Sequence, residues 1–125
     1  MNRDEIKEFL PHREPMLLLD EVEVNAETGE AVGKYTVRGD EFFLQGHFPG
    51  HPIVPGVIQC EMIAQTAVAL LPDCKGKTPL YTGLNNVKFK NPLMPGDTAF
   101  MPVALTNRRG VFCFAMGNLS ANGKV

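Results

Sequence analysis

Residues 45–71 read QGHFPGHPIVPGVIQCEMIAQTAVALL, and they divide at Gly56 into two parts of opposite character. The first part, residues 45–56, holds three prolines and three glycines in twelve residues. Proline fixes φ and removes a backbone donor, whereas glycine frees the backbone, so this part is neither a helix nor a strand interior. We predict a loop of fixed and unusual shape, as an active-site loop must be.

The second part, residues 57–71, contains good helix formers and no breaker until Pro72. Its apolar residues lie nearly all round the predicted helix, which indicates a buried helix rather than one laid on a surface. Strand patterns precede and follow this helix, and a sheet formed by them would cover it. We therefore predict an α+β fold, with an antiparallel sheet wrapped around one long central helix.

Strand patterns flank this helix on both sides. They are expected at residues 16–24 and 30–38 before it, and at residues 80–90, 98–106 and 111–119 after it. The last of these carries apolar residues on both faces, which predicts a central strand.

The two ends of the chain carry weaker signals. A short helix is expected at residues 3–10, before Pro11. Asn122 and Gly123 form a hairpin signal with only two residues after it, so we expect a truncated final strand and an exposed sheet edge.

Length and composition fit one globular domain over residues 1–125, with 44% apolar and 21% charged residues. The formal net charge of −2 argues against nucleic acid or an anionic membrane as a bulk partner. No apolar stretch is long enough to span a bilayer, and the N-terminus lacks a signal-peptide core. The three cysteines, Cys60, Cys74 and Cys113, form no CxxC pair, which predicts reduced thiols in a cytoplasmic protein.

Glu61 is the only charged residue between His51 and Asp73, and it lies in the apolar helix. An unpaired buried carboxylate tends to hold its proton, which would make Glu61 a general acid. The alternative is a glutamate whose head reaches solvent or pairs with a basic residue.

Histidine is the commonest general base near neutral pH, and His47 lies in the rigid loop. The alternative is a histidine that only satisfies a backbone carbonyl. His51 is a second candidate. No cysteine or carboxylate is placed to complete a metal site with His47 and His51, so we predict no metal. His12 is interpreted as structural.

Gly56 opens the helix, where unpaired N–H groups face outward and a glycine lets a ligand oxygen approach the backbone. Such a position suits a carbonyl oxygen that becomes an enolate. A base, an acid and an oxyanion donor thus fall within fifteen residues, from His47 to Glu61. Together they fit β-elimination of water.

Four segments resemble the FabZ-type 3-hydroxyacyl-[acyl-carrier-protein] dehydratases of bacterial fatty acid synthesis. They are residues 10–20 (LPHREPMLLLD), 46–56 (GHFPGHPIVPG), 61–65 (EMIAQ) and 87–97 (VKFKNPLMPGD). The resemblance implies a hot-dog fold and a dimer whose sheets join, often assembled as a trimer of dimers. It also implies that no metal or redox cofactor is needed, because the phosphopantetheine arm arrives with the substrate.

By this resemblance His47 is the catalytic histidine, and Glu61 is its acidic partner from the other subunit. The Gly56 amide would hold the thioester carbonyl, and Phe48, Pro55 and Gln65 are the other predicted substrate-binding residues. His51 takes no direct part. The acyl chain would lie in an apolar tunnel near the dimer interface, and a glutamate at position 61 favours the FabZ branch over the isomerising FabA branch.

Two departures stand out. Position 14 is Glu where the family usually has an aromatic residue, and family members carry a further strand after residue 125.

The expected function is reversible dehydration of (3R)-3-hydroxyacyl-[acyl-carrier-protein] to trans-2-enoyl-[acyl-carrier-protein] in fatty acid biosynthesis. A hot-dog acyl thioesterase and a non-catalytic carrier-protein binding module remain as alternatives. Carrier proteins are acidic, so a basic mouth is expected, with solvated surface charges as the alternative reading. The candidate residues for that mouth are Lys88, Lys90, Arg108 and Arg109.

Overall fold

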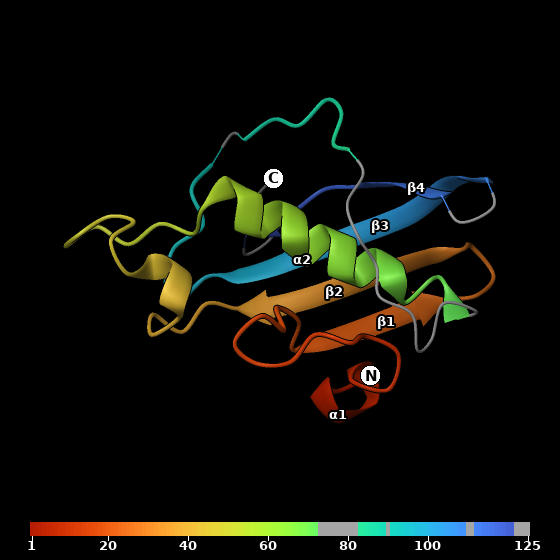
Figure 1. The fold of residues 1–125 in the computed structure, drawn as a ribbon, viewed down its shortest axis with the longest axis horizontal. Coiled ribbons are helices and arrows are strands. Elements are labelled where there is room, and N and C mark those ends of the chain that lie inside the picture. Colours follow the sequence, from red (N-terminus) through yellow and green to blue (C-terminus); the bar gives the residue numbers. More distant parts are fainter. Residues whose placement is uncertain (73–82, 90, 110–111, 122–125) are drawn as a thin grey trace.

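The computed structural model describes residues 1–72, 83–89, 91–109 and 112–121. In these residues an antiparallel sheet of five strands lies against one long helix, with a short helix near the N-terminus (Figure 1). The elements in chain order are α1 (Arg3–Ile6), β1 (Glu21–Asn25), β2 (Glu30–Thr36), the 3-10 helix η1 (Phe42–Leu44), α2 (Gly56–Val68), β3 (Thr98–Arg109), β4 (Phe112–Gly117) and β5 (Ser120–Ala121).

The strands follow the order β1-β2-β3-β4, and β5 pairs with β3. Val103 lies opposite Gly117 of β4, and Phe100 lies opposite Ser120 of β5, so β5 continues the register of the second half of β4; the register of β4 shifts between Leu105 and Asn107 of β3. The predicted strand at 111–119 is present as β4 over Phe112–Gly117, and β5 follows it to Ala121. Within the described sheet β4 forms an edge, so the prediction that this strand is central is wrong. Apolar residues on both faces of a strand therefore did not indicate a strand with a neighbour on each side.

Helix α2 packs closely on one face of the sheet. A Cβ added at Gly33 of β2 would stand 2.2 Å from the Thr66 hydroxyl, and one at Gly117 would stand 2.8 Å from a methyl group of Ile63. These glycines let the helix approach the strands. The predicted sheet around one helix is confirmed, and the core lies between the two layers.

The helix is buried on one side only. Met62, Gln65 and Thr66 are buried, whereas Val57 is 72% exposed. The sequence predicted burial all round, and within the described residues the other α2 positions are only partly buried. The helix ends at Val68 rather than at the predicted Leu71, and the predicted N-terminal helix is shortened to α1.

Residues 16–19 do not form a strand, although Leu17, Leu18 and Leu19 are fully buried. The reason is visible at Leu18, whose backbone N–H donates to the Gln65 side chain at 2.9 Å instead of to a neighbouring strand. An apolar run predicts burial, but it does not specify the backbone's partner.

Residues 83–89 do not form a strand either, and every one of them is exposed. They run outside the sheet, beyond α2 (Figure 1), and Asn86 has a left-handed φ of 54°. Their alternating pattern indicated a strand, but a strand needs a neighbour with which to pair. The rest of that predicted strand, residues 80–82 and Lys90, lies outside the described residues, as do Cys74 and the hairpin signal at 122–123.

Within the described ranges, no helix is both long and apolar enough to cross a lipid bilayer. Cys60 and Cys113 form no disulfide within the described residues, and burial raises the pKa of Cys60.

Candidate active site

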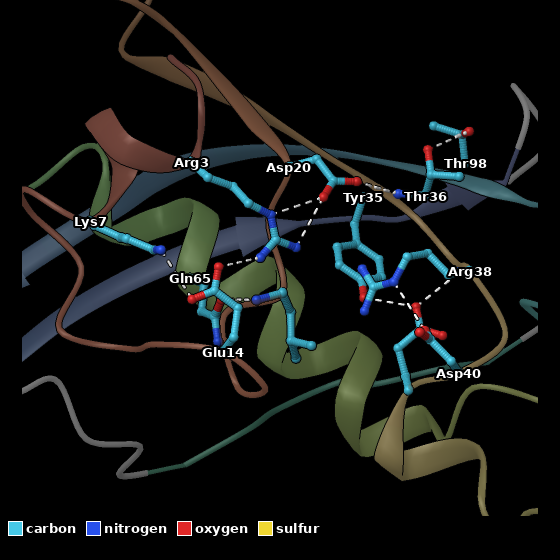
Figure 2. A network of polar contacts seen from close by, with 12 residues as sticks. Arg3, Lys7, Glu14, Asp20, Tyr35, Thr36, Arg38, Asp40, Gln65 and Thr98 are labelled. Atoms are coloured by element: carbon cyan, nitrogen blue, oxygen red, sulfur yellow. Dashed lines mark hydrogen bonds and ion pairs between the residues drawn. The ribbon is translucent and has the colours of Figure 1, made fainter.

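A buried carboxylate fixes the chain just before the predicted active-site loop. Glu41 accepts hydrogen bonds from the Tyr35 hydroxyl at 2.8 Å and from the backbone amides of Arg38 and Gly39 at 2.9 and 2.8 Å. Burial alone would raise the pKa of Glu41, but these three donors outweigh it and hold that pKa below its usual value. Burial likewise raises the pKa of Tyr35, so its phenol stays a donor. The bend between β2 and η1 is thereby held in place (Figure 2).

His47 follows η1 in the proline- and glycine-rich loop. Its backbone amide donates to the Leu44 carbonyl at 3.2 Å, and its ring Nδ1 lies 2.9 Å from the Ile53 carbonyl. A carbonyl oxygen only accepts, so Nδ1 carries a hydrogen, and in the neutral imidazole Nε2 is then the nitrogen with the lone pair. The His47 ring also stacks on Phe48, with ring centroids 4.3 Å apart. The loop therefore presents Nε2 as the free basic nitrogen.

A cavity of about 480 Å³ lies beside His47 at the start of α2. Its lining includes His47, Gly56 and Phe89, together with Ile53, Val54, Val57, Gln59, Asn91 and Pro92. The Phe89 ring lies directly over Gly56, where an added Cβ would come within 2.8 Å of the ring. In the described part of the chain, the Gly56 amide has no hydrogen-bond acceptor. The first turn of α2 thus offers a backbone donor in the same cavity as the His47 ring.

Glu61 is not in that cavity. It lies five positions after Gly56, which turns its side chain by about 140° around the helix axis. Its side chain is 17% exposed, and its Oε2 atom lies 3.2 Å from Nε2 of His12 and 2.8 Å from Nε2 of Gln65. The prediction of a shielded carboxylate agrees with this exposure, but the prediction that Glu61 lacks a partner is wrong.

Gln65 links Glu61 to the segment at residues 11–20. Its Oε1 atom accepts from the Leu18 amide, while its Nε2 atom donates to the Met16 carbonyl at 2.8 Å and to Glu61. All these partners are protein atoms, and Gln65 is buried. Its predicted contact with substrate stays a prediction; in this chain its amide holds Glu61.

Ion pairs anchor the same segment to α1. Glu14 pairs with Arg3 at 2.9 Å and with Lys7 at 3.1 Å, and Arg3 also reaches Asp20 (Figure 2). A hydrogen bond to its own backbone and the bonds from Lys7 and Arg3 lower the pKa of Glu14 to about 2. The charge at position 14, where the family usually has an aromatic residue, therefore has two basic partners here.

The remaining predicted site residues are dispersed. Phe48 is half exposed beside His47, and Pro55 caps α2, where its carbonyl accepts from the amides of Ile58 and Gln59. Lys88, Arg108 and Arg109 are exposed. The two arginines end β3 at the side of the sheet opposite to the 45–56 loop of the same chain (Figure 1), and Lys90 lies outside the described residues.

The sequence interpretation of His12 as structural did not include a contact with Glu61, and the structure places its Nε2 atom 3.2 Å from Oε2 of that residue. The one sequence feature that could have indicated a functional role for His12 is its place in residues 10–20, one of the four segments that resemble the family. Among the residues that the structure describes, no three His, Cys, Asp or Glu side chains gather so that they could hold a metal ion.

Comparison with known proteins identifies the family. A curated relative from Clostridium perfringens, the 3-hydroxyacyl-[acyl-carrier-protein] dehydratase FabZ, is 44% identical over 128 residues, covering 100% of this chain and 91% of its own. The chain belongs to the FabZ family. A second FabZ relative, from Enterococcus faecalis, is 46% identical over 123 residues, covering 96% of this chain and 87% of its own. The predicted FabZ resemblance is confirmed.

A further match supports a dehydratase, and another supports the fold. The family model described as ApeI dehydratase matches residues 23–124. The solved structure of the dehydratase heterocomplex ApeI:P from Xenorhabdus doucetiae matches with a TM-score of 0.77 at 24% identity, covering 95% of this chain and 82% of that chain. At this identity the second match bears on the fold alone. With the sheet and helix described above, it confirms the predicted hot-dog fold.

Proposed function

We propose that this protein reversibly dehydrates (3R)-3-hydroxyacyl-[acyl-carrier-protein] to trans-2-enoyl-[acyl-carrier-protein] in fatty acid biosynthesis. The FabZ relatives bear the name of this activity. The observation that carries the proposal is the 2.9 Å contact between Nδ1 of His47 and the Ile53 carbonyl, which leaves Nε2 as a base in a cavity that also holds a backbone donor.

His47 removes the proton from the carbon next to the thioester carbonyl. The electron pair of that C–H bond forms the new double bond between the α and β carbons. The fixed Nδ1–H bond keeps the imidazole oriented and stabilises the imidazolium that forms.

Gly56 holds the thioester carbonyl oxygen through its backbone amide. Negative charge develops on this oxygen as the α proton leaves, and a donor at the start of α2 stabilises it, aided by the helix dipole. The absence of a Cβ matters because the Phe89 ring already closes the space above Gly56.

Glu61 gives a proton to the departing 3-hydroxyl, so the C–O bond breaks and water leaves. Since Glu61 lies outside the His47 cavity of its own chain, we assign it to the site of a partner subunit. This requires a homodimer, which we propose as the working unit, with a trimer of dimers as a further assembly. Acid and base suffice for the reaction, so the proposal includes no metal or redox cofactor.

Uncovered apolar surface supports the dimer. The edge strand β4 exposes Phe112, Phe114 and Met116, the last of them 72%, and residues 83–89 lack a strand to pair with in the described chain. Edge strands and large exposed apolar side chains are normally covered by a neighbour. A second copy joined at this side of the sheet would provide that cover and an apolar path for the acyl chain.

Arg108 and Arg109 are proposed to receive the acidic carrier protein, together with Lys88 and Lys90. In a two-fold dimer with joined sheets, the strands of the two subunits run antiparallel. The arginine end of β3 in one subunit then lies toward the end at which its partner carries His47. Positive charge at the mouth of each site would steer the carrier.

Reversing both arginines, Arg108→Glu with Arg109→Glu, should raise KM for the carrier-linked substrate about tenfold and leave kcat unchanged. The wild-type KM should rise with salt, because exposed charges are screened. The matched control is the coenzyme A thioester of the same acyl group, whose KM should not change. An unchanged, salt-insensitive KM for the carrier-linked substrate would remove these residues from the interface.

The test of the function is an assay of the wild-type protein with 3-hydroxybutyryl-[acyl-carrier-protein] and longer homologues. Enoyl formation, read by ultraviolet absorbance, is the expected result. Release of free thiol without enoyl product would indicate a thioesterase, and binding without turnover would indicate a carrier-binding module. We expect a single-domain enzyme of the cytoplasm, where thiols such as those of Cys60 and Cys113 remain reduced.

A further inference from the structure

Two side chains hold the same oxygen of the Glu61 carboxylate. Nε2 of Gln65 lies 2.8 Å from Oε2, and Nε2 of His12 lies 3.2 Å from it. Within the described residues, Oε1 has no hydrogen-bond partner. Two N–H donors on one oxygen leave the other oxygen as the position for the proton that the proposed general acid gives up. The arrangement therefore distinguishes the two oxygens of the general acid.

We infer that His12 is a positioning residue, which turns the Glu61 carboxyl so that Oε1 faces the reacting hydroxyl. This inference rests on the proposed function, in which Glu61 is the acid. Gln65 alone cannot fix the carboxyl, since one hydrogen bond leaves it free to rotate about that contact. A second donor, from the segment at 10–20 rather than from α2, sets the plane of the group.

The other ring nitrogen of His12 supports this role. Nδ1 is buried, and among the described residues it has no hydrogen-bond partner. An unpaired buried polar atom is a cost that a purely structural side chain would avoid. Within the described residues, the His12 ring thus makes its polar contact with Glu61 and none with the rest of the fold.

The segment that carries His12 is rigid. The Arg13 guanidinium donates to the carbonyls of Lys7, Leu10 and His12 at 3.2, 2.8 and 2.7 Å. Glu14 is bound to Arg3 and Lys7. The two charged groups next to His12 in the chain therefore have other partners, and neither competes for Glu61. Such support is what holds a positioning residue within the small tolerance of a reacting geometry.

The test compares two variants of His12 in the full-length enzyme. His12→Leu has similar volume but no donor, whereas His12→Gln can place an amide N–H where Nε2 stands. We expect His12→Leu to lower kcat about 10²-fold with KM changed little, because misplacing a reacting group by about 1 Å has that effect. We expect His12→Gln to recover most of the wild-type kcat. If His12→Leu does not fold, His12→Asn replaces it, since its amide is too short to reach Glu61.

A double-mutant cycle separates positioning from a general structural role. In the Glu61→Gln background, His12→Leu should cause almost no further loss of kcat, since groups that act as a unit are not additive. An equal loss in both backgrounds, or no rescue by His12→Gln, would overturn the inference. If the wild-type protein forms no enoyl product, the proposed function itself is wrong. This outcome is distinct from those that overturn only the role of His12.

Discussion

His47→Asn should lower kcat about 10²–10⁴-fold, the usual contribution of a general base, while the loop keeps its shape. The asparagine amide nitrogen occupies nearly the position of Nδ1 and can still donate to the Ile53 carbonyl, which is 2.9 Å from that atom in the wild-type protein. The variant therefore removes the basic Nε2 and the ring stacking on Phe48, but keeps the hydrogen bond that shapes the loop. Steady-state rates with a 3-hydroxyacyl carrier substrate measure the effect, and the melting temperature should change little.

His51→Ala is the matched control for that variant. His51 lies in the same loop, its side chain is exposed, and it is held through its backbone, which exchanges hydrogen bonds with Phe48. Its loss should leave kcat within about twofold of wild type, as expected for a surface substitution. Near-native turnover by His47→Asn, or an equal loss in His51→Ala, would contradict the assignment of the base.

The parts of the fold that depend on local chemistry could be predicted from the sequence. The prolines and glycines at 45–56 predicted the loop, and the breaker-free run after them predicted α2. The base nitrogen and the Gly56 amide share one cavity because they are close in the chain. Short sequence separation made this half of the candidate site accessible to sequence reasoning.

The other half depends on contacts between distant segments. Gln65 meets Met16 across 49 positions, and Glu61 meets His12 from a different part of the chain. No local pattern reports such contacts. Alternation of apolar and polar residues predicts a strand, but it does not identify the strand with which that segment pairs. For this reason the sequence predicts a strand that is absent at residues 83–89 and a central position for β4, which lies at an edge.

Glu61→Gln should also lower kcat about 10²–10⁴-fold, because the amide keeps the shape of the side chain but has no acidic proton to give. The amide can still meet Gln65 and His12 as an acceptor through its oxygen, so α2 and the 10–20 segment should stay packed. Circular dichroism and melting temperature check that point.

Mixing the two inactive variants tests whether the acid crosses the subunit interface. If each site takes His47 from one subunit and Glu61 from the other, a mixed dimer has one doubly defective site and one intact site. Equal co-expression of His47→Asn and Glu61→Gln makes about half of the dimers mixed, so about a quarter of wild-type activity should return. Separately purified variants, combined without subunit exchange, should show no recovery. A co-expressed sample that remains as inactive as its parents, with mixed dimers verified by mass spectrometry, would mean that acid and base act within one chain. Glu61, which points away from the His47 cavity and toward His12, would then have to be replaced by another acid.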